Sequence, residues 1–167
     1  MVDPKEPLFL KAYDQYADAL FRYCYLRLYD RTEARDMVQE AFLRTWRYLG
    51  EKGPIENIRA FLYKIATNLI INKNQRKRAT SLDVLLEKGF DPGFDDRERR
   101  IDFLDGLRVM EKLSEIDPKY KEALYLRYVE DLSPKEIAEI LEENENAVSV
   151  RIHRGIKKLK EHMSYEA

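Results

Sequence analysis

The chain has 167 residues, which allows one domain or two small ones. Its 30 Lys and Arg residues nearly balance 31 Asp and Glu, so any contact with nucleic acid has to come from local basic patches. The single cysteine, Cys24, excludes an internal disulfide and favours a reducing compartment, and neither a signal peptide nor a run of about 20 apolar residues is present. We therefore expect a cytoplasmic protein without membrane insertion.

The composition favours an all-α fold, because glycine and proline are few, six of each, and alternating β-branched runs are rare. Apolar residues at helical spacing predict a first helix over 8–29. Its stripe includes Tyr13, Tyr16 and Tyr23, which we interpret as packing at the edge of a core. Stacking of these rings on single-stranded bases is the alternative.

A second helix is predicted over 33–49, with Thr32 as its cap. One side is apolar, and Phe42 and Trp46, one turn apart, are interpreted as core residues. The other side is mostly polar but includes Leu43, and an apolar residue among charges weakly indicates a partner site.

A third helix is predicted over 58–78, capped by Asn57 after a turn-rich loop at 50–56. Its outward face combines basic, amide and aromatic side chains: Arg59, Tyr63, Lys64, Thr67, Asn68, Asn72 and Asn74. Cations hold phosphates, amides read base edges, and aromatic rings stack on unpaired bases, so this helix is a candidate nucleic-acid surface. The alternative is that the basic residues at its end only compensate the helix dipole.

The amino-acid composition changes after residue 79. Residues 80–100 contain glycine, proline and a cluster of acidic side chains, which predicts a flexible linker with one helical turn at 84–88. Helical periodicity resumes over 101–115, and Asp117 can cap a further helix that runs to 129. We divide the chain into an N-terminal bundle (1–79), an acidic linker (80–102) and a C-terminal bundle (103–167).

The C-terminal bundle is predicted to contain a helix-turn-helix within 132–160. Ser133, Pro134 and Glu136 form a helix start with a capping box, 142–146 is a short polar turn, and a second helix follows. Ala147, Val148 and Ile152 belong to its predicted inner face, and its charged residues are mostly basic. A helix that enters the major groove needs such a basic outer face, although an ordinary solvated surface helix is the alternative.

The sequence contains no residue pattern that is typical of an active site for a small-molecule substrate. The only histidines, His153 and His162, are too far apart along a helix to share a metal ion, and no glycine-rich phosphate loop or nucleophile motif is present. We therefore expect neither an enzyme nor a bound metal or cofactor.

Three stretches in this order resemble one family, the extracytoplasmic-function sigma factors of bacterial RNA polymerase. Residues 36–49 (DMVQEAFLRTWRYL) resemble the family's polymerase-binding helix, and 57–78 (NIRAFLYKIATNLIINKNQRKR) resemble its promoter-melting and −10-reading helix. Residues 116–159 resemble its −35-reading domain. The resemblance implies a stress-response type of sigma factor that binds core polymerase, recognises −35 and −10 elements and assists DNA melting. A helix-turn-helix regulator not associated with polymerase is the alternative.

The resemblance also implies partners and site residues. The expected partners are the β′ clamp helices and β flap of core polymerase, promoter DNA and an anti-sigma factor, and the acidic linker would thread the RNA channel. The implied polymerase-binding residues are Asp36, Gln39, Glu40 and Leu43. The implied −10 residues are Arg59, Tyr63, Asn68, Asn72, Arg76, Lys77 and Arg78, with the loop at 50–56 placed to pocket a flipped base. The implied −35 residues are Lys121, Ser149, Val150, Arg151, His153, Arg154, Lys157 and Lys158.

Several positions depart from the family pattern. Glu142 stands where the family often has glycine, Ala147 where threonine is usual, and Asp117 where proline is frequent. Ser149, Val150 and Asn72 also replace more usual residues. Because base-reading atoms differ at these positions, the sequence does not predict which promoter is recognised.

Overall fold

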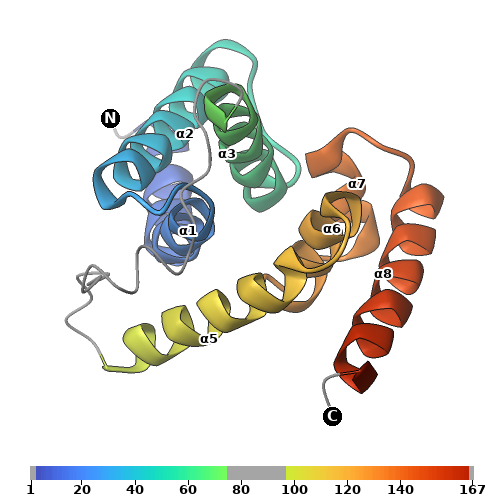
Figure 1. The fold of residues 1–167 in the computed structure, drawn as a ribbon. Helices are drawn as coiled ribbons and strands as arrows, with labels where there is room; N and C mark the ends of the chain where they lie inside the picture. The colour runs from blue at the N-terminus through green and yellow to red at the C-terminus, as the bar shows by residue number, and fades with distance from the viewer. Residues whose placement is uncertain (1–2, 75–96, 166–167) are drawn as a thin grey trace. The chain divides into compact units, whose positions relative to one another are not determined.

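The structure is a computed structural model that describes residues 3–74 and 97–165 (Figure 1). All regular secondary structure in these two ranges is α-helical, which confirms the predicted all-α class. The chain divides into two compact units, 1–90 and 91–167. Most of the predicted linker, including the helical turn expected at 84–88, lies outside the described residues.

The N-terminal unit packs three helices against one another: α1 (Lys5–Leu28), α2 (Arg31–Glu51) and α3 (Ile58–Asn74). Its core includes a polar interaction as well as aliphatic side chains. The Tyr23 hydroxyl and Thr67 Oγ1 are 2.7 Å apart and buried, and the Tyr23 and Tyr63 rings meet edge to face at 5.1 Å. Because a buried hydroxyl needs a hydrogen-bond partner, this cluster fixes how α3 is turned against α1.

Side-chain caps begin α2 and α3, and one of the two predicted caps is wrong. The cap of α2 is Asp30, whose carboxylate accepts a hydrogen bond from Glu33 N–H at 2.9 Å, and not Thr32 as predicted. Asn57 caps α3 as predicted, accepting from Ala60 N–H at 3.0 Å.

Tyr29 ends α1 in the left-handed conformation. Burial raises the pKa of the Tyr29 phenol, while the charge of Arg27 opposes that shift.

Two aromatic residues predicted to be in or beside the core lie at the surface. Tyr13 is 49% exposed and Trp46 is 38% exposed, whereas Phe42 is buried as predicted. Together with Phe9, these three rings form a cluster between α1 and α2. Phe9 contacts both Phe42 and Trp46, and Tyr13 contacts Phe42. Helical spacing indicates on which side of each helix these rings lie, but it does not show how much of that side the neighbouring helix covers.

The C-terminal unit contains α5 (Arg97–Ser114), α6 (Pro118–Tyr128), α7 (Pro134–Leu141) and α8 (Glu145–Tyr165). Helix α6 contacts the other three helices and carries the centre of the core. Helix α5 begins at Arg97, whereas the sequence predicted linker up to residue 100. The four residues at 97–100 are all charged, so the sequence there has no apolar periodicity from which a helix could be predicted.

The helix-turn-helix has the predicted start and a well-defined turn. Ser133 and Glu136 form the capping box of α7, with both reciprocal hydrogen bonds present. Glu142 ends α7 in the left-handed conformation, with φ of 56°, and Asn144 caps α8 by accepting from Asn146 N–H at 2.8 Å. Ala147 is exposed, so its predicted place on the inner face of α8 is wrong, while Val148 and Ile152 are buried there.

Gly155 brings α8 close to α6. A Cβ atom built at this position would lie 3.1 Å from both Leu124 Cδ1 and Tyr120 Cβ. Two helices can approach this closely only where a side chain is missing from one of them. By contrast, a Cβ at Gly50 in α2 would meet nothing within 4 Å.

We expect Gly155→Val to lower the free energy of unfolding by about 1–3 kcal/mol, because overpacking this contact forces α8 away from α6. Thermal unfolding followed by circular dichroism measures the change. The matched control is Gly50→Val, which inserts the same side chain into open space and should leave the melting temperature little changed. Equal effects of the two substitutions would contradict this account of the contact.

Candidate nucleic-acid interface

The outer side of α8 carries most of the residues that the sequence predicted for duplex contact. Ser149, Val150, His153, Arg154, Lys157 and Lys158 are all exposed. Arg151 on α8 and Lys121 on α6 are only half-exposed. The inner side, with Val148 and Ile152, faces the core. The geometry therefore separates an apolar face that holds the helix in place from a polar face that is free for a ligand.

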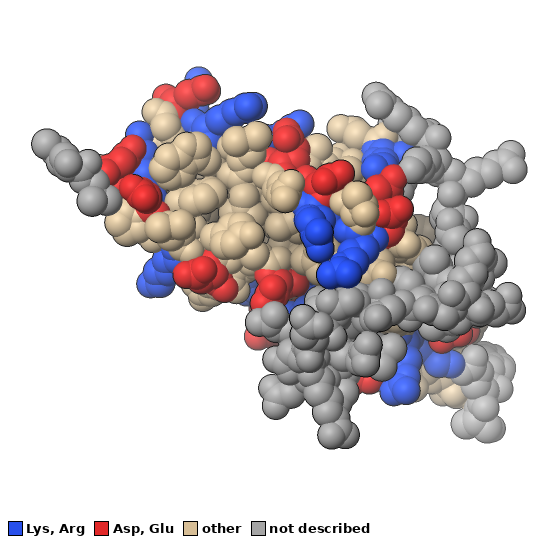
Figure 2. Space-filling model, turned by 90° about the vertical axis from the view of Figure 1, so that its left-hand side faces the viewer, with Lys and Arg blue, Asp and Glu red and all other residues tan. Residues whose placement is uncertain are grey.

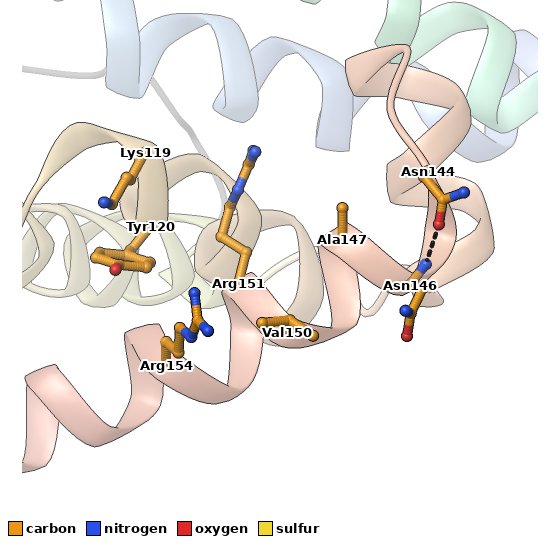
Figure 3. Close-up of a pocket in the computed structure, with 8 residues that line it drawn as sticks. All are labelled: Lys119, Tyr120, Asn144, Asn146, Ala147, Val150, Arg151 and Arg154. Carbon is orange, nitrogen blue, oxygen red and sulfur yellow. Dashed lines mark hydrogen bonds between the residues drawn. The ribbon is translucent and has the colours of Figure 1, made fainter.

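Part of this outer side borders a groove of about 550 Å³ (Figure 3). Three predicted residues, Val150, Arg151 and Arg154, line it. The other lining residues were not predicted from the sequence for this role: Lys119, Tyr120, Asn144, Asn146 and Ala147. Asn144 could have been found from its capping preference just before the periodic stretch. Lys119 and Tyr120 could not, because only the packing of α6 against α8 brings the start of α6 beside the groove.

One cation of the groove is held by an ion pair. Arg151 Nη2 lies 2.5 Å from a carboxylate oxygen of Glu143, a residue in the turn between α7 and α8. Both side chains are partly shielded, at 25% and 33% exposed, so solvent screens the pair less than it would a fully exposed one. The backbone N–H of Glu143 also donates to Ala138 O at 2.9 Å, so the turn that carries the carboxylate is itself fixed.

The chemistry of this face suits a nucleic-acid duplex. Cationic side chains bind phosphates, amide and guanidinium groups pair with base edges, and small apolar groups contact thymine methyls. The face belongs to the second helix of a helix-turn-helix, the element that enters the major groove in DNA-binding proteins with this motif.

Helix α3 presents a different surface, and here the structure corrects the predicted positions of two residues. Asn68, Ile71 and Asn72 are exposed, as the sequence led us to expect for the two asparagines. The prediction that Tyr63 lies on this outward face is wrong, because its side chain is fully buried against Tyr23. Successive residues are about 100° apart around a helix, so Tyr63 lies about 140° from Asn68, on the side that faces the core. Thr67 is likewise buried rather than outward-facing.

The structure describes only some of the basic residues predicted for the third helix. Arg59 is half-buried, with its guanidinium carbon 6.0 Å from the centre of the Tyr63 ring. Lys73 pairs with Glu33 of α2 at 2.9 Å, which ties the end of α3 to the start of α2. Arg76, Lys77 and Arg78 lie outside the described residues.

The residues predicted to face outward on α2 are exposed or half-exposed. Asp36 and Gln39 are exposed, Leu43 is 43% exposed, and Glu40 pairs with Arg44 at 2.6 Å. Figure 2 looks at the side of the molecule where α1 and α2 lie in Figure 1, and shows a broad uncharged area with charged side chains mainly around its edge. Exposed apolar side chains of these helices include Leu8, Leu10 and Tyr13 of α1 and Leu43, Trp46 and Tyr48 of α2. Such mixed apolar and polar surfaces are typical of sites for protein partners.

Within ranges 3–74 and 97–165, no group of three or more His, Cys, Asp or Glu side chains is arranged to hold a metal ion. Among the same residues, no helix combines the length and the apolar character needed to cross a membrane.

Two family models match the chain, and they cover it in order. The model described as sigma-70 region 2 matches residues 12–80, and the model described as sigma-70, region 4 matches residues 106–159. The first match includes most of α1 and all of α2 and α3. The second includes α6 and α7 and most of α8, with the groove residues between Lys119 and Arg154.

Curated relatives match over most of the chain. The ECF RNA polymerase sigma factor SigW of Bacillus subtilis is 28% identical, over 90% of this chain and 86% of SigW. SigL of Mycobacterium tuberculosis, also an ECF sigma factor, is 26% identical over 89% of this chain and 84% of its own. BldN of Streptomyces coelicolor is 29% identical over 90% of this chain but only 58% of BldN.

A solved structure has a similar fold. CnrH, solved in complex with the cytosolic domain of CnrY, matches with a TM-score of 0.70 at 22% identity. The match covers 97% of this chain and 91% of CnrH.

We expect Glu143→Gln to strengthen binding of the full chain to random-sequence duplex DNA at low salt. The substitution removes an anion from beside the groove and releases Arg151 to neutralise one more phosphate, so the slope of log affinity against log salt should steepen by about 0.9. Fluorescence anisotropy titrations at several salt concentrations measure it.

The control is Glu139→Gln, which removes the same charge from the exposed surface of α7. It should leave the salt slope unchanged. If both substitutions alter the slope equally, the ion pair does not restrain Arg151 in the way described.

Proposed function

Because this chain belongs to the sigma-70 family of RNA polymerase sigma factors, in its extracytoplasmic-function group, and directs promoter-specific transcription, we propose that it contacts the promoter at two separate places. The C-terminal bundle (103–167) binds the −35 element, and the N-terminal bundle (1–79) binds the −10 element and core polymerase. The segment 80–102 connects them and occupies the RNA channel of the polymerase.

The −35 assignment depends on one observation, the exposed polar face of α8 beside the groove. Within that face we assign Val150 and Arg154 to the base edges, together with Ser149 and His153. Arg151, which Glu143 holds at the turn, lies at the margin of this contact. Lys121, Lys157 and Lys158 bind phosphates on either side. Lys119 joins this set, since it lies at the start of α6 and lines the same groove.

The −10 assignment is supported by the exposed asparagines of α3. Asn68 and Asn72 lie one turn apart, and an amide both donates and accepts, so the pair is suited to the edges of unpaired bases. We assign Arg59, Arg76, Lys77 and Arg78 to phosphate contacts and the loop at 50–56 to a flipped base. Tyr63 has a different role from the one the resemblance implied, since it supports α3 from within the core.

The proposed mechanism contains no bond chemistry. Opening of the duplex is driven by capture of bases that have already left the stack, because a bound, unpaired base cannot return to its partner. The protein therefore acts as a binding subunit, and the polymerase supplies the reaction.

Contact with core polymerase is assigned to the outer side of α2. Asp36, Gln39, Glu40 and Leu43 form a mixed polar and apolar surface there, which fits the β′ clamp helices. The C-terminal bundle contacts the β flap. CnrH, which has the same fold, was solved in complex with the cytosolic domain of CnrY. We propose that this chain also has a regulatory protein partner, an anti-sigma factor, that covers the polymerase-binding side of the N-terminal bundle.

The full chain should co-purify with bacterial core polymerase and then support run-off transcription from promoters found by selection from a random library. Core polymerase alone is the control. Failure to form a holoenzyme would refute the polymerase assignment.

We expect Arg154→Ala to weaken binding of the holoenzyme to −35 duplex by about 1–3 kcal/mol, through loss of a base or phosphate contact. The control is Arg108→Ala on α5, where the arginine is exposed and pairs only weakly with Asp105 at 3.3 Å. Its binding should equal that of the unchanged chain. Unchanged affinity of the Arg154 variant would remove this residue from the interface.

We expect Asn68→Ala to impair promoter opening more than it impairs binding of closed duplex, because the amide meets bases only after they unpair. Permanganate footprinting of thymines in the −10 region reports opening, and a gel-shift titration reports duplex binding. Gln15→Ala, which removes an exposed amide from α1, is the matched control and should open normally. Normal opening by the Asn68 variant would contradict its assigned role.

A further inference from the structure

Two exposed apolar side chains lie on the groove face of α8. Ala147 and Val150 both line the groove and are one turn apart, and Arg154 follows one turn later on the same side (Figure 3). Val150 is 40% exposed, while Val148 and Ile152 are buried against the rest of the unit at 0% and 8% exposed. The core of the unit is thus complete without Val150 and Ala147.

The surroundings of Val150 make it more than an isolated exposed residue, which by itself would need no explanation. The groove that it lines also contains the Asn144 and Asn146 side chains and the cations of Lys119 and Arg154. Groups that bind base edges and phosphates therefore frame a small apolar surface. A ligand that is complementary to this groove has one small apolar group surrounded by hydrogen-bonding and anionic groups.

The ion pair between Glu143 and Arg151 leaves this spot uncovered. Arg151 follows Val150 directly in the chain, and its guanidinium is held at the turn by the Glu143 carboxylate. The long arginine side chain is therefore not free to fold over Val150. The apolar surface stays accessible because the neighbouring cation is already paired.

In the major groove of DNA, the C5-methyl of thymine is the one apolar group among hydrogen-bonding edges, and small aliphatic side chains contact it. We infer that Val150, together with Ala147, recognises thymine methyl groups in the −35 duplex. This inference rests on the proposed function of α8 and deepens it, because it names the base that the apolar part of the groove selects. Cytosine, adenine and guanine offer only polar groups or bare ring edges at this place.

Deoxyuridine tests the inference because it differs from thymidine only by the missing methyl. Holoenzyme assembled with the full chain first selects duplexes from a random library. Each thymine of the upstream element in a selected duplex is then replaced by deoxyuridine, and affinity is measured by anisotropy. At one or two adjacent positions the replacement should weaken binding about fourfold per methyl, the ratio expected when one methyl group loses its burial.

Val150→Ala should abolish most of this sensitivity, so that thymine and uracil duplexes bind alike at the affected position. The matched control is Val109→Ala on α5, where the valine is 39% exposed and does not line the groove. That variant should keep the full fourfold difference. A double-mutant cycle between the side chain and the base methyl then isolates their interaction from any general loss of affinity.

The outcomes separate this inference from the function on which it rests. If the holoenzyme selects a duplex whose binding does not respond to uracil, or if Val150→Ala responds as strongly as the unchanged chain, the thymine assignment is overturned while −35 binding stands. If no duplex is selected at all, the proposed function of α8 fails and the inference fails with it.

Discussion

The close contact between α6 and α8 is the constraint on which the C-terminal unit depends. Gly155 lets α8 approach Tyr120 and Leu124 more closely than any larger residue would allow. Because this side of α8 packs against α6, the opposite side of α8 faces outward. The first turn of α6 then lies beside that outer side. The groove therefore results from core packing, since the contact of Gly155 with Tyr120 and Leu124 brings the start of α6 beside the outer side of α8.

In the N-terminal unit the equivalent constraint is polar. The hydroxyls of Tyr23 and Thr67 form a buried hydrogen bond, and Tyr63 packs on Tyr23 beside it. Breaking that bond would leave an unsatisfied buried group, so α3 has one favourable rotation about its axis. This rotation turns Asn68 and Asn72 to the surface. Tyr63 and Thr67 were predicted to share an outward face with Asn68 and Asn72. They lie instead in the core, where they help to orient the helix that carries the two exposed asparagines.

Electrostatics act locally in this protein, whose formal net charge is only −1. Pairs such as Glu143 with Arg151 and Glu33 with Lys73 hold particular cations in place at partly shielded positions. Arg154, Lys157 and Lys158 are exposed on the outer side of α8. A net charge this small provides little overall attraction to nucleic acid, so our proposal for α8 depends on local groups and not on the charge of the whole chain.

The sequence by itself determined the helical class, the positions of most helices, the capping box at Ser133 and the polar outer sides of α2 and α8. These features follow from local rules, since periodicity and capping involve residues within one or two turns of each other. Only the tertiary structure decided that Tyr63 and Thr67 are buried, that Tyr13, Trp46 and Ala147 are exposed, and that Lys119 joins Arg154 at one groove. Helical spacing shows which side of a helix a residue is on, whereas burial depends on how much of that side the neighbouring helices cover, and that is set by contacts between residues far apart in the chain.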